Sequence, residues 1–213
     1  MHHALLSKDL EEILREEKRD RALTLNQMMQ RTEGRGFYLL MILFSLPFLA
    51  PVSVPGLSCL MGPVILILAL RLAMRLPARL PRFIGERPFD PKRMSRVLQA
   101  TIKVVRLIEK LVRPRKTSWM RWRAVQAHNA LVIAVMALLL ALPLSVLPFT
   151  NTLPSYAIIL LAVSMMEEDG VTIWIGYAAS TGTVVYFVSI AEVLSRLYAR
   201  YYHQLKAWFF SLL

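Results

Sequence analysis

The chain has 213 residues, of which 56% are hydrophobic, and it carries a formal net charge of +12. A soluble domain this apolar could not cover its own surface with polar side chains, so composition excludes an ordinary water-soluble globular protein. Long uncharged runs alternate with basic segments, which is typical of an integral membrane protein with basic cytoplasmic loops.

Residues 1–35 are predicted to form an N-terminal amphipathic segment on the cytoplasmic side of the membrane. Leu6, Leu10 and Ile13 recur at helical spacing among charged residues, which gives one apolar stripe and one charged face. The segment is too rich in charge to be a secretory signal. Because the stripe adjoins the first apolar run, an interfacial helix is favoured over a solvated one.

Residues 36–75 contain two apolar runs separated by a break, and we predict that they form a first membrane hairpin. The break is the sequence Pro-Val-Ser-Val-Pro-Gly at residues 51–56. Each run has about 14 to 18 residues, at or just under the roughly 17 to 25 that a helix needs to cross the hydrocarbon. Either two short helices cross the membrane, or one re-entrant hairpin enters it and returns.

Residues 76–127 form a linker that the positive-inside rule places in the cytoplasm, because residues 71–123 hold sixteen Lys or Arg against three acids. An apolar period of about 3.6 residues predicts an amphipathic helix over 91–113. We expect its cations to bind anionic lipid headgroups, with a protein partner as the alternative. Nucleic acid is not an expected partner, since no aromatic-interleaved motif accompanies the charge. The membrane-surface residues are Arg93, Arg96, Lys103 and Arg106.

Residues 128–170 repeat the pattern of the first hairpin and are predicted to form a second one. The pair Leu142-Pro143 corresponds to Leu46-Pro47, and a second break runs from 148 to 154. Order, length and break position favour an internal duplication over coincidence, as in membrane folds built from repeats. The alignment requires a gain or loss of three residues within the breaks.

Residues 171–195 are long and apolar enough to form a final transmembrane helix, followed by an aromatic and basic tail at 196–213. Two pairs of small residues four apart could let another helix approach closely. If the second hairpin returns to its own side, the C-terminus lies outside the cell. If one of its halves does not cross, the C-terminus stays inside. The small pairs are Gly176/Ser180 and Ala178/Gly182.

We expect the two breaks to meet near the membrane midplane and to form the functional centre. A helix that begins at each break would present free backbone N–H groups and a positive dipole end. A phosphate or a sugar hydroxyl could bind there, and the alternative is that the polar side chains only cap their own helices. The candidate residues are Ser53, Pro55, Gly56, Ser58, Thr150, Asn151, Thr152 and Pro154.

The sequence predicts no catalytic residues, metal ligands or cofactor, and we expect the protein not to be an enzyme. The apolar regions 37–70 and 130–166 contain no Asp, Glu, Lys, Arg or His. The acids Glu167, Glu168 and Asp169 at the edge of the second region fit a solvated helix cap better than an active site. A Gly-rich phosphate-binding loop is also absent from the sequence.

Several short motifs follow one another along the chain. They are Arg35-Gly36-Phe37, Leu46-Pro47, Pro55-Gly56-Leu57-Ser58, Gly62-Pro63, Asn151-Thr152-Leu153-Pro154 and Glu168-Asp169-Gly170. In this order they resemble the ExoD family of bacterial inner-membrane proteins associated with exopolysaccharide synthesis. The resemblance covers about residues 20–195 and departs from the family pattern at Phe48 and Thr150. It implies a multi-pass protein of the bacterial inner membrane with a role in polysaccharide synthesis or export.

These patterns together predict an all-α integral membrane protein with two repeated broken or re-entrant helical hairpins, a final transmembrane helix and interfacial amphipathic helices. Transport or handling of a lipid-linked or anionic small substrate at the breaks is the first functional hypothesis. A non-catalytic structural or regulatory role in a polysaccharide assembly complex is the second. We also expect a homodimer, because unsatisfied backbone groups exposed to lipid cost several kcal/mol each, roughly, and a partner would cover them.

Overall fold

The computed structural model describes residues 35–49, 56–76, 118–144 and 147–211, which form helices and turns without a strand. The predicted all-helical class is therefore confirmed for this part of the chain. The predicted helix over 91–113 and nearly all of the segment 1–35 lie outside the described residues. The elements are α3 (Gly36–Ser45), η1 (Leu46–Phe48), α4 (Leu57–Ala73), η2 (Ser118–Arg121), α7 (Arg123–Ala141), α8 (Thr152–Glu167) and α9 (Gly170–Ser211).

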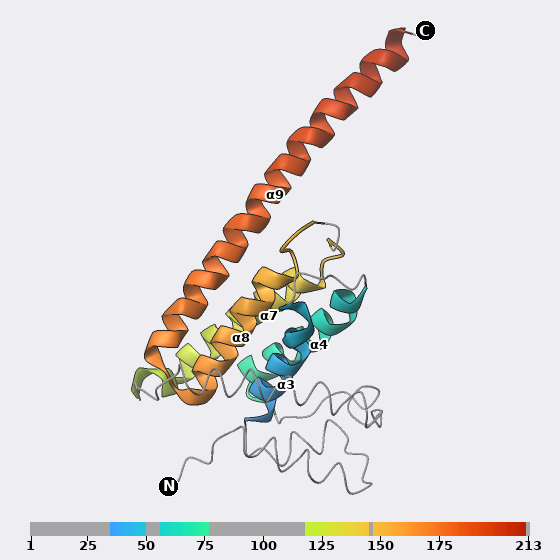
Figure 1. Ribbon diagram of the computed structural model, residues 1–213. Coiled ribbons are helices and arrows are strands. Elements are labelled where there is room, and N and C mark those ends of the chain that lie inside the picture. Colours follow the sequence, from blue (N-terminus) through green and yellow to red (C-terminus); the bar gives the residue numbers. More distant parts are fainter. Residues whose placement is uncertain (1–34, 50–55, 77–117, 145–146, 212–213) are drawn as a thin grey trace, which may run out of the picture.

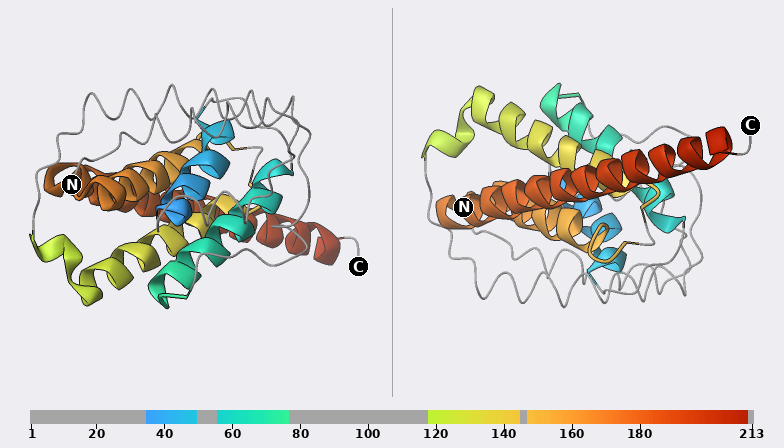
Figure 2. Two further views of the ribbon diagram at one scale, coloured as in Figure 1. Left: turned by 90° about the horizontal axis from the view of Figure 1, so that it is seen from below. Right: turned by 90° about the horizontal axis from the view of Figure 1, so that it is seen from above.

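Four helices close into a ring, in which α3 packs against α4 and α8, and α7 packs against the same two helices. The fifth helix, α9, packs along α8 on one side of the ring and extends well beyond it (Figures 1 and 2). The core of the ring is apolar, as expected where helices bury their faces against one another. Its largest fully buried side chains are Leu39, Leu40, Met41, Ile42, Ile65, Leu68 and Ile133.

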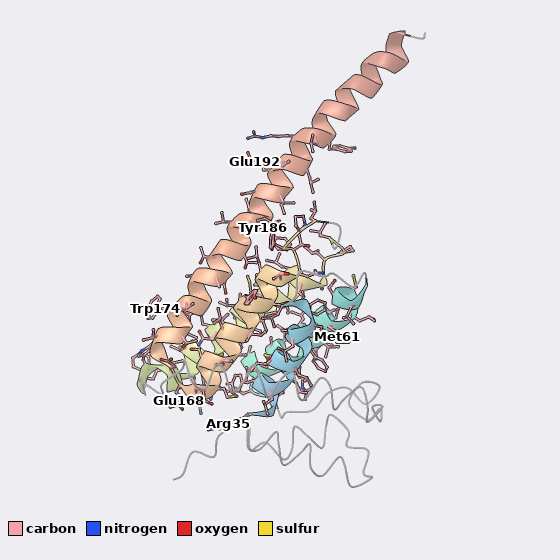
Figure 3. The ribbon with its side chains drawn as sticks, in the orientation of Figure 1. Arg35, Met61, Glu168, Trp174, Tyr186 and Glu192 are labelled. Carbon is pink, nitrogen blue, oxygen red and sulfur yellow. The ribbon has the colours of Figure 1, made fainter. Side chains whose placement is uncertain are left out.

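Neighbouring helices of the ring run in opposite directions. Near the start of α4, Gly62 lies against Ala141 at the end of α7. Just after the end of α4, the guanidinium of Arg75 donates to the side-chain carbonyl of Gln126 in the first turn of α7, at 3.1 Å. The two predicted breaks therefore lie at the same end of the ring, which we call the break end (Figure 1). The opposite end, with Arg35 and Glu168 in Figure 3, is the basic end.

Proline and left-handed residues set the helix boundaries near the breaks. Pro47 has no N–H to continue the hydrogen bonds of α3, and the chain passes into the short η1 turn. Gly56 precedes α4 with φ +82°, a conformation that favours glycine. Between α8 and α9 the left-handed residue is Glu168, with φ 54°.

Asp169 caps α9 with both carboxylate oxygens. One oxygen accepts the backbone N–H of Val171 at 3.0 Å, and the other accepts the hydroxyl of Thr172 at 2.7 Å. The Ser164 hydroxyl donates to the Asp169 carbonyl at 2.9 Å. The expected cap is present, but it is not solvated, because these contacts leave Asp169 only 3% exposed. A side-chain acceptor at this position satisfies an N–H group that has no partner within its helix.

The last helix is longer than the sequence pattern predicts. The apolar run suggested a helix over 171–195 and a separate tail, whereas α9 is continuous from Gly170 to Ser211. The pair Gly176/Ser180 is buried, and a Cβ on Gly176 would come within 2.8 Å of the Leu161 side chain of α8. The second small pair, Ala178/Gly182, is exposed. Only the first pair therefore serves packing within the chain.

Within the described ranges, two helices are long and apolar enough to cross a membrane, namely Arg123–Ala141 and the Gly170–Tyr198 part of α9. The other three apolar helices are shorter. At about 1.5 Å per residue, α4 and α8 are each roughly 25 Å long, less than the roughly 30 Å of a hydrocarbon core. Of the hairpin helices described, α7 is thus long enough to cross the hydrocarbon, whereas α3, α4 and α8 are not.

The close approach of α4 and α7 at Gly62 gives a test of the ring. A Cβ on Gly62 would lie 2.7 Å from the Cα and Cβ of Ala141, so Gly62→Ala has to push the helices apart. We expect a loss of about 1–3 kcal/mol of unfolding free energy, measured by thermal unfolding in detergent.

The matched control is Gly182→Ala, because a Cβ there would meet no atom within 4 Å. Alanine forms helix better than glycine, so this variant should be as stable as the parent or gain up to about 1 kcal/mol. Equal stability of the two variants would show that α4 and α7 do not touch at Gly62.

Candidate functional site at the helix breaks

Hydroxyl groups satisfy the backbone of the second break. The buried Thr150 hydroxyl lies 2.9 Å from the carbonyl oxygens of both Leu144 and Leu147 and donates to them. From α9, the Tyr186 hydroxyl donates to the carbonyl of Pro148 at 2.5 Å, which ties α9 to the break (Figure 3). Side chains of the protein therefore supply hydrogen-bond partners to three backbone carbonyl groups of this break.

Asn151 differs from its surroundings, because its side-chain amide is buried without a partner. It is 4% exposed, and neither its Nδ2 nor its Oδ1 makes a hydrogen bond within the described part of the chain. Its carbonyl, in contrast, accepts both the N–H and the hydroxyl of Ser155, at 3.3 and 2.7 Å. A buried polar group without a partner costs about 1–3 kcal/mol.

The capping alternative does not explain Asn151. It occupies the position before α8, yet it has helical backbone angles, φ −94° and ψ −35°, and its side chain makes no capping bond. A capping residue has extended angles, from which its side chain can reach the free N–H groups. Thr152 is the first residue of α8, and Pro154 follows it in the first turn, where a missing N–H leaves no bond unmade.

Two of the four candidate residues of the first break, Gly56 and Ser58, lie in the described part of the chain. Gly56 is exposed and left-handed, and Ser58 is 0% exposed with a hydroxyl that makes no hydrogen bond among the described residues. The other two candidates of this break, Ser53 and Pro55, lie outside the described residues. The membrane-surface candidates Arg93, Arg96, Lys103 and Arg106 also lie outside them.

The sequence pattern missed Ser45, which has the same property as Ser58. It is the last residue of α3, it is 0% exposed, and its hydroxyl has no partner in the described structure. A single serine in an apolar run carries no periodic signal, so only its position before Leu46-Pro47 could have drawn attention to it. The structure thus brings Ser45, Ser58 and Asn151 to the same end of the ring.

The break end is polar without being charged. The sequence has no acidic, basic or histidine residue over 37–70 and 130–166. In the described ranges, no group of three or more His, Cys, Asp or Glu side chains could hold a metal ion. The side chains at the break end can therefore form hydrogen bonds with an uncharged polar group, or bind a charged one only weakly.

The fold and the break end define an all-helical protein with broken apolar hairpins and two helices that could span a membrane. The family model described as "Exopolysaccharide synthesis, ExoD" matches residues 6–189, so the chain belongs to the ExoD family. This confirms the resemblance drawn from the motifs, and it links the chain to exopolysaccharide synthesis.

Two relatives show how far the similarity extends. Protein ExoD of Rhizobium meliloti is 33% identical over 169 residues, which cover 79% of this chain and 70% of that protein. An uncharacterized protein of Synechocystis is 25% identical over 191 residues, which cover 89% of each chain. No solved structure matches the chain significantly.

The contrast between Thr150 and Asn151 predicts opposite effects on stability. Thr150→Val removes a hydroxyl whose single O–H is shared between two partly buried carbonyls, and we expect it to lower the unfolding free energy by about 1–3 kcal/mol. Asn151→Leu replaces an unpaired amide by an apolar group of similar size, and it should be neutral or stabilising. Thermal unfolding of the purified variants measures both. A large loss of stability in Asn151→Leu would mean that the amide has a partner within the folded chain.

Proposed function

We propose that this chain is a protein of the bacterial inner membrane that acts in exopolysaccharide synthesis or export by holding a lipid-linked or anionic small substrate at the break end. The observation that carries the proposal is the buried, unpaired amide of Asn151. Every other polar contact described in that break is made between protein groups. A substrate with polar groups would supply the partner that the amide lacks.

Handling of a substrate fits the residues better than chemistry does. An enzyme of glycosyl or phosphoryl transfer needs carboxylates, a metal or a nucleophile with its base, placed together. The break end offers an amide and hydroxyls. The carboxylate of Asp169 lies at the other end of the ring and is committed to the cap of α9. We therefore propose a binding role without catalysis.

The length of α9 supports a specific depth for the breaks. From Val171 to Ala191 the helix carries no charged residue, and this stretch of about 20 residues spans roughly 30 Å, the thickness of the hydrocarbon. Tyr186, which bonds the second break, lies more than one turn before Glu192. If α9 spans the membrane over this stretch, the break lies about 7 Å inside the boundary.

This depth would make the hairpins re-entrant and nearer the far boundary than the midplane. Irregular backbone at membrane depth is tolerated only where protein or a wet cavity satisfies it. The hydrogen bonds from Thr150 and Tyr186 to three carbonyl groups meet this requirement. The short lengths of α4 and α8 agree with hairpins that turn before they reach the far side.

From the opposite directions of neighbouring helices we also propose on which side of the membrane the C-terminus lies. The basic end, next to the linker 76–127, belongs in the cytoplasm by the positive-inside rule. Because α9 begins at the basic end and passes the break end, it would carry the C-terminus to the periplasm (Figure 1).

Reporter fusions test this topology. Alkaline phosphatase fused after Leu213 should be active and green fluorescent protein at the same site should be dark, since each reports the periplasmic side. Fusions within the linker 76–127 serve as the control and should give the opposite pattern. A fluorescent C-terminal fusion would show that α9 does not carry the C-terminus across the membrane.

Polysaccharide output tests the binding role. In a strain that lacks its own copy, Asn151→Leu should lower exopolysaccharide by about tenfold or more, as the loss of two hydrogen bonds of about 1 kcal/mol each implies. Its thermal stability should not fall. Thr150→Val is the matched control, and it should lose stability but keep its output per folded molecule.

The second candidate, a structural or regulatory component of an assembly complex, has its own observation. The small pair Ala178/Gly182 is exposed, and a Cβ on Gly182 would meet no atom within 4 Å, so another helix could approach there. A homodimer through this pair is our proposal for that case. Full polysaccharide output from Asn151→Leu would favour this candidate over substrate binding.

A further inference from the structure

Three buried side chains at the break end, each from a different part of the ring, share the lack of a partner. Ser45 ends α3, Ser58 lies in the first turn of α4, and Asn151 precedes α8. They are 0%, 0% and 4% exposed, and their side-chain polar atoms make no hydrogen bond within the described residues. Since α3 packs against both α4 and α8, these three segments belong to one side of the ring.

The missing bonds are unusual in this chain, because other helix hydroxyls do find partners. Ser155, Ser180 and Thr183 each donate to the carbonyl four residues earlier, at 2.7 to 2.8 Å. Serine and threonine in helices commonly make this bond. Ser45 lies within the regular helix α3 and does not make it. Its hydroxyl is therefore buried without a hydrogen-bond partner among the described residues.

The chemistry of the three side chains distinguishes between ligands. Each serine hydroxyl can donate and accept, and the Asn151 amide has donors on Nδ2 and an acceptor on Oδ1. An ionised phosphate only accepts hydrogen bonds, so it would leave Oδ1 unpaired. It would also be buried without a cation, because the sequence has none over 37–70 and 130–166. A sugar hydroxyl both donates and accepts, and it carries no charge.

We propose that the break end binds the uncharged hydroxyl groups of a sugar through Ser45, Ser58 and Asn151. This inference rests on the proposed function and narrows it, since it selects the sugar over an anionic group. Ser45 joins the site although no motif marks it. If the substrate is a lipid-linked sugar, its phosphate binds outside this group of side chains.

Photolabelling of the full-length protein in lipid nanodiscs tests the choice of ligand. The probe is an alkyl glucoside that carries a diazirine, and the labelled peptides are mapped by mass spectrometry. We expect labels on the segments around Ser45, Ser58 and Asn151. An excess of octyl glucoside should remove these labels, and the same concentration of octyl phosphate should not.

Variants connect the label to the three side chains. The combined change Ser45→Ala, Ser58→Ala and Asn151→Leu should reduce labelling of the break end by about tenfold, because all the proposed hydrogen bonds are lost. Ser180→Ala is the control, since its hydroxyl is buried but already bonded. Thermal unfolding is measured for each variant. If the triple variant does not fold, Asn151→Leu alone carries the comparison.

Two results would overturn the inference, and they differ in what they mean for the proposed function. Competition by octyl phosphate as strong as that by octyl glucoside would show an anion site, so the sugar would be wrong and a substrate at the break end would stand. Labels spread over all helices, with no competition from either compound, would remove the site and the proposed function with it.

Discussion

A backbone that turns within an apolar layer has to find its hydrogen-bond partners in the protein, because hydrocarbon offers none. The second break meets this constraint with side chains, since Thr150 and Tyr186 donate to carbonyl groups of the turn. Tyr186 belongs to α9, so the same bond fixes the long helix against the break. The need of the turn's carbonyl groups for hydrogen-bond donors thus links the conformation of the turn to the position of α9. Against this background the buried Asn151 amide is an exception, since neither of its polar side-chain atoms makes a hydrogen bond within the described residues.

The arrangement of the ring agrees with the duplication suggested by the two Leu-Pro pairs, although duplication stays a prediction. Each hairpin supplies one helix that runs toward the break end, α3 or α7, and one that returns, α4 or α8. The hairpins also differ, since α3 has 10 residues before its proline-containing turn and α7 has 19.

Sequence patterns predicted the helices well where proline, glycine and long apolar runs determine their ends. They predicted the helix boundary at Gly56, because this residue acts on the local backbone. They failed for α9, since an apolar run records where a helix meets lipid and not where the helix stops. They also missed the exceptional state of Ser45 and of the Asn151 side chain. Whether a buried hydroxyl or amide has a partner depends on neighbours from other helices, which no local pattern contains.

The continuity of α9 has a mechanical consequence. Between Tyr186, at the break, and Ser211 the chain is one helix without a proline or glycine, so it transmits rotation as well as distance. Along the helix, Ser211 lies about 37 Å beyond Tyr186, which bonds the Pro148 carbonyl. Each residue between them rotates the direction of the C-terminal end about the helix axis by about 100°. Removing one residue from this part of α9 would turn its C-terminal end by about 100° and shorten the helix by only about 1.5 Å. Removing seven would nearly restore the direction and draw the end about 10 Å closer. Deletions of different length in α9 can therefore change either the direction in which its C-terminal end faces or the distance of that end from the break.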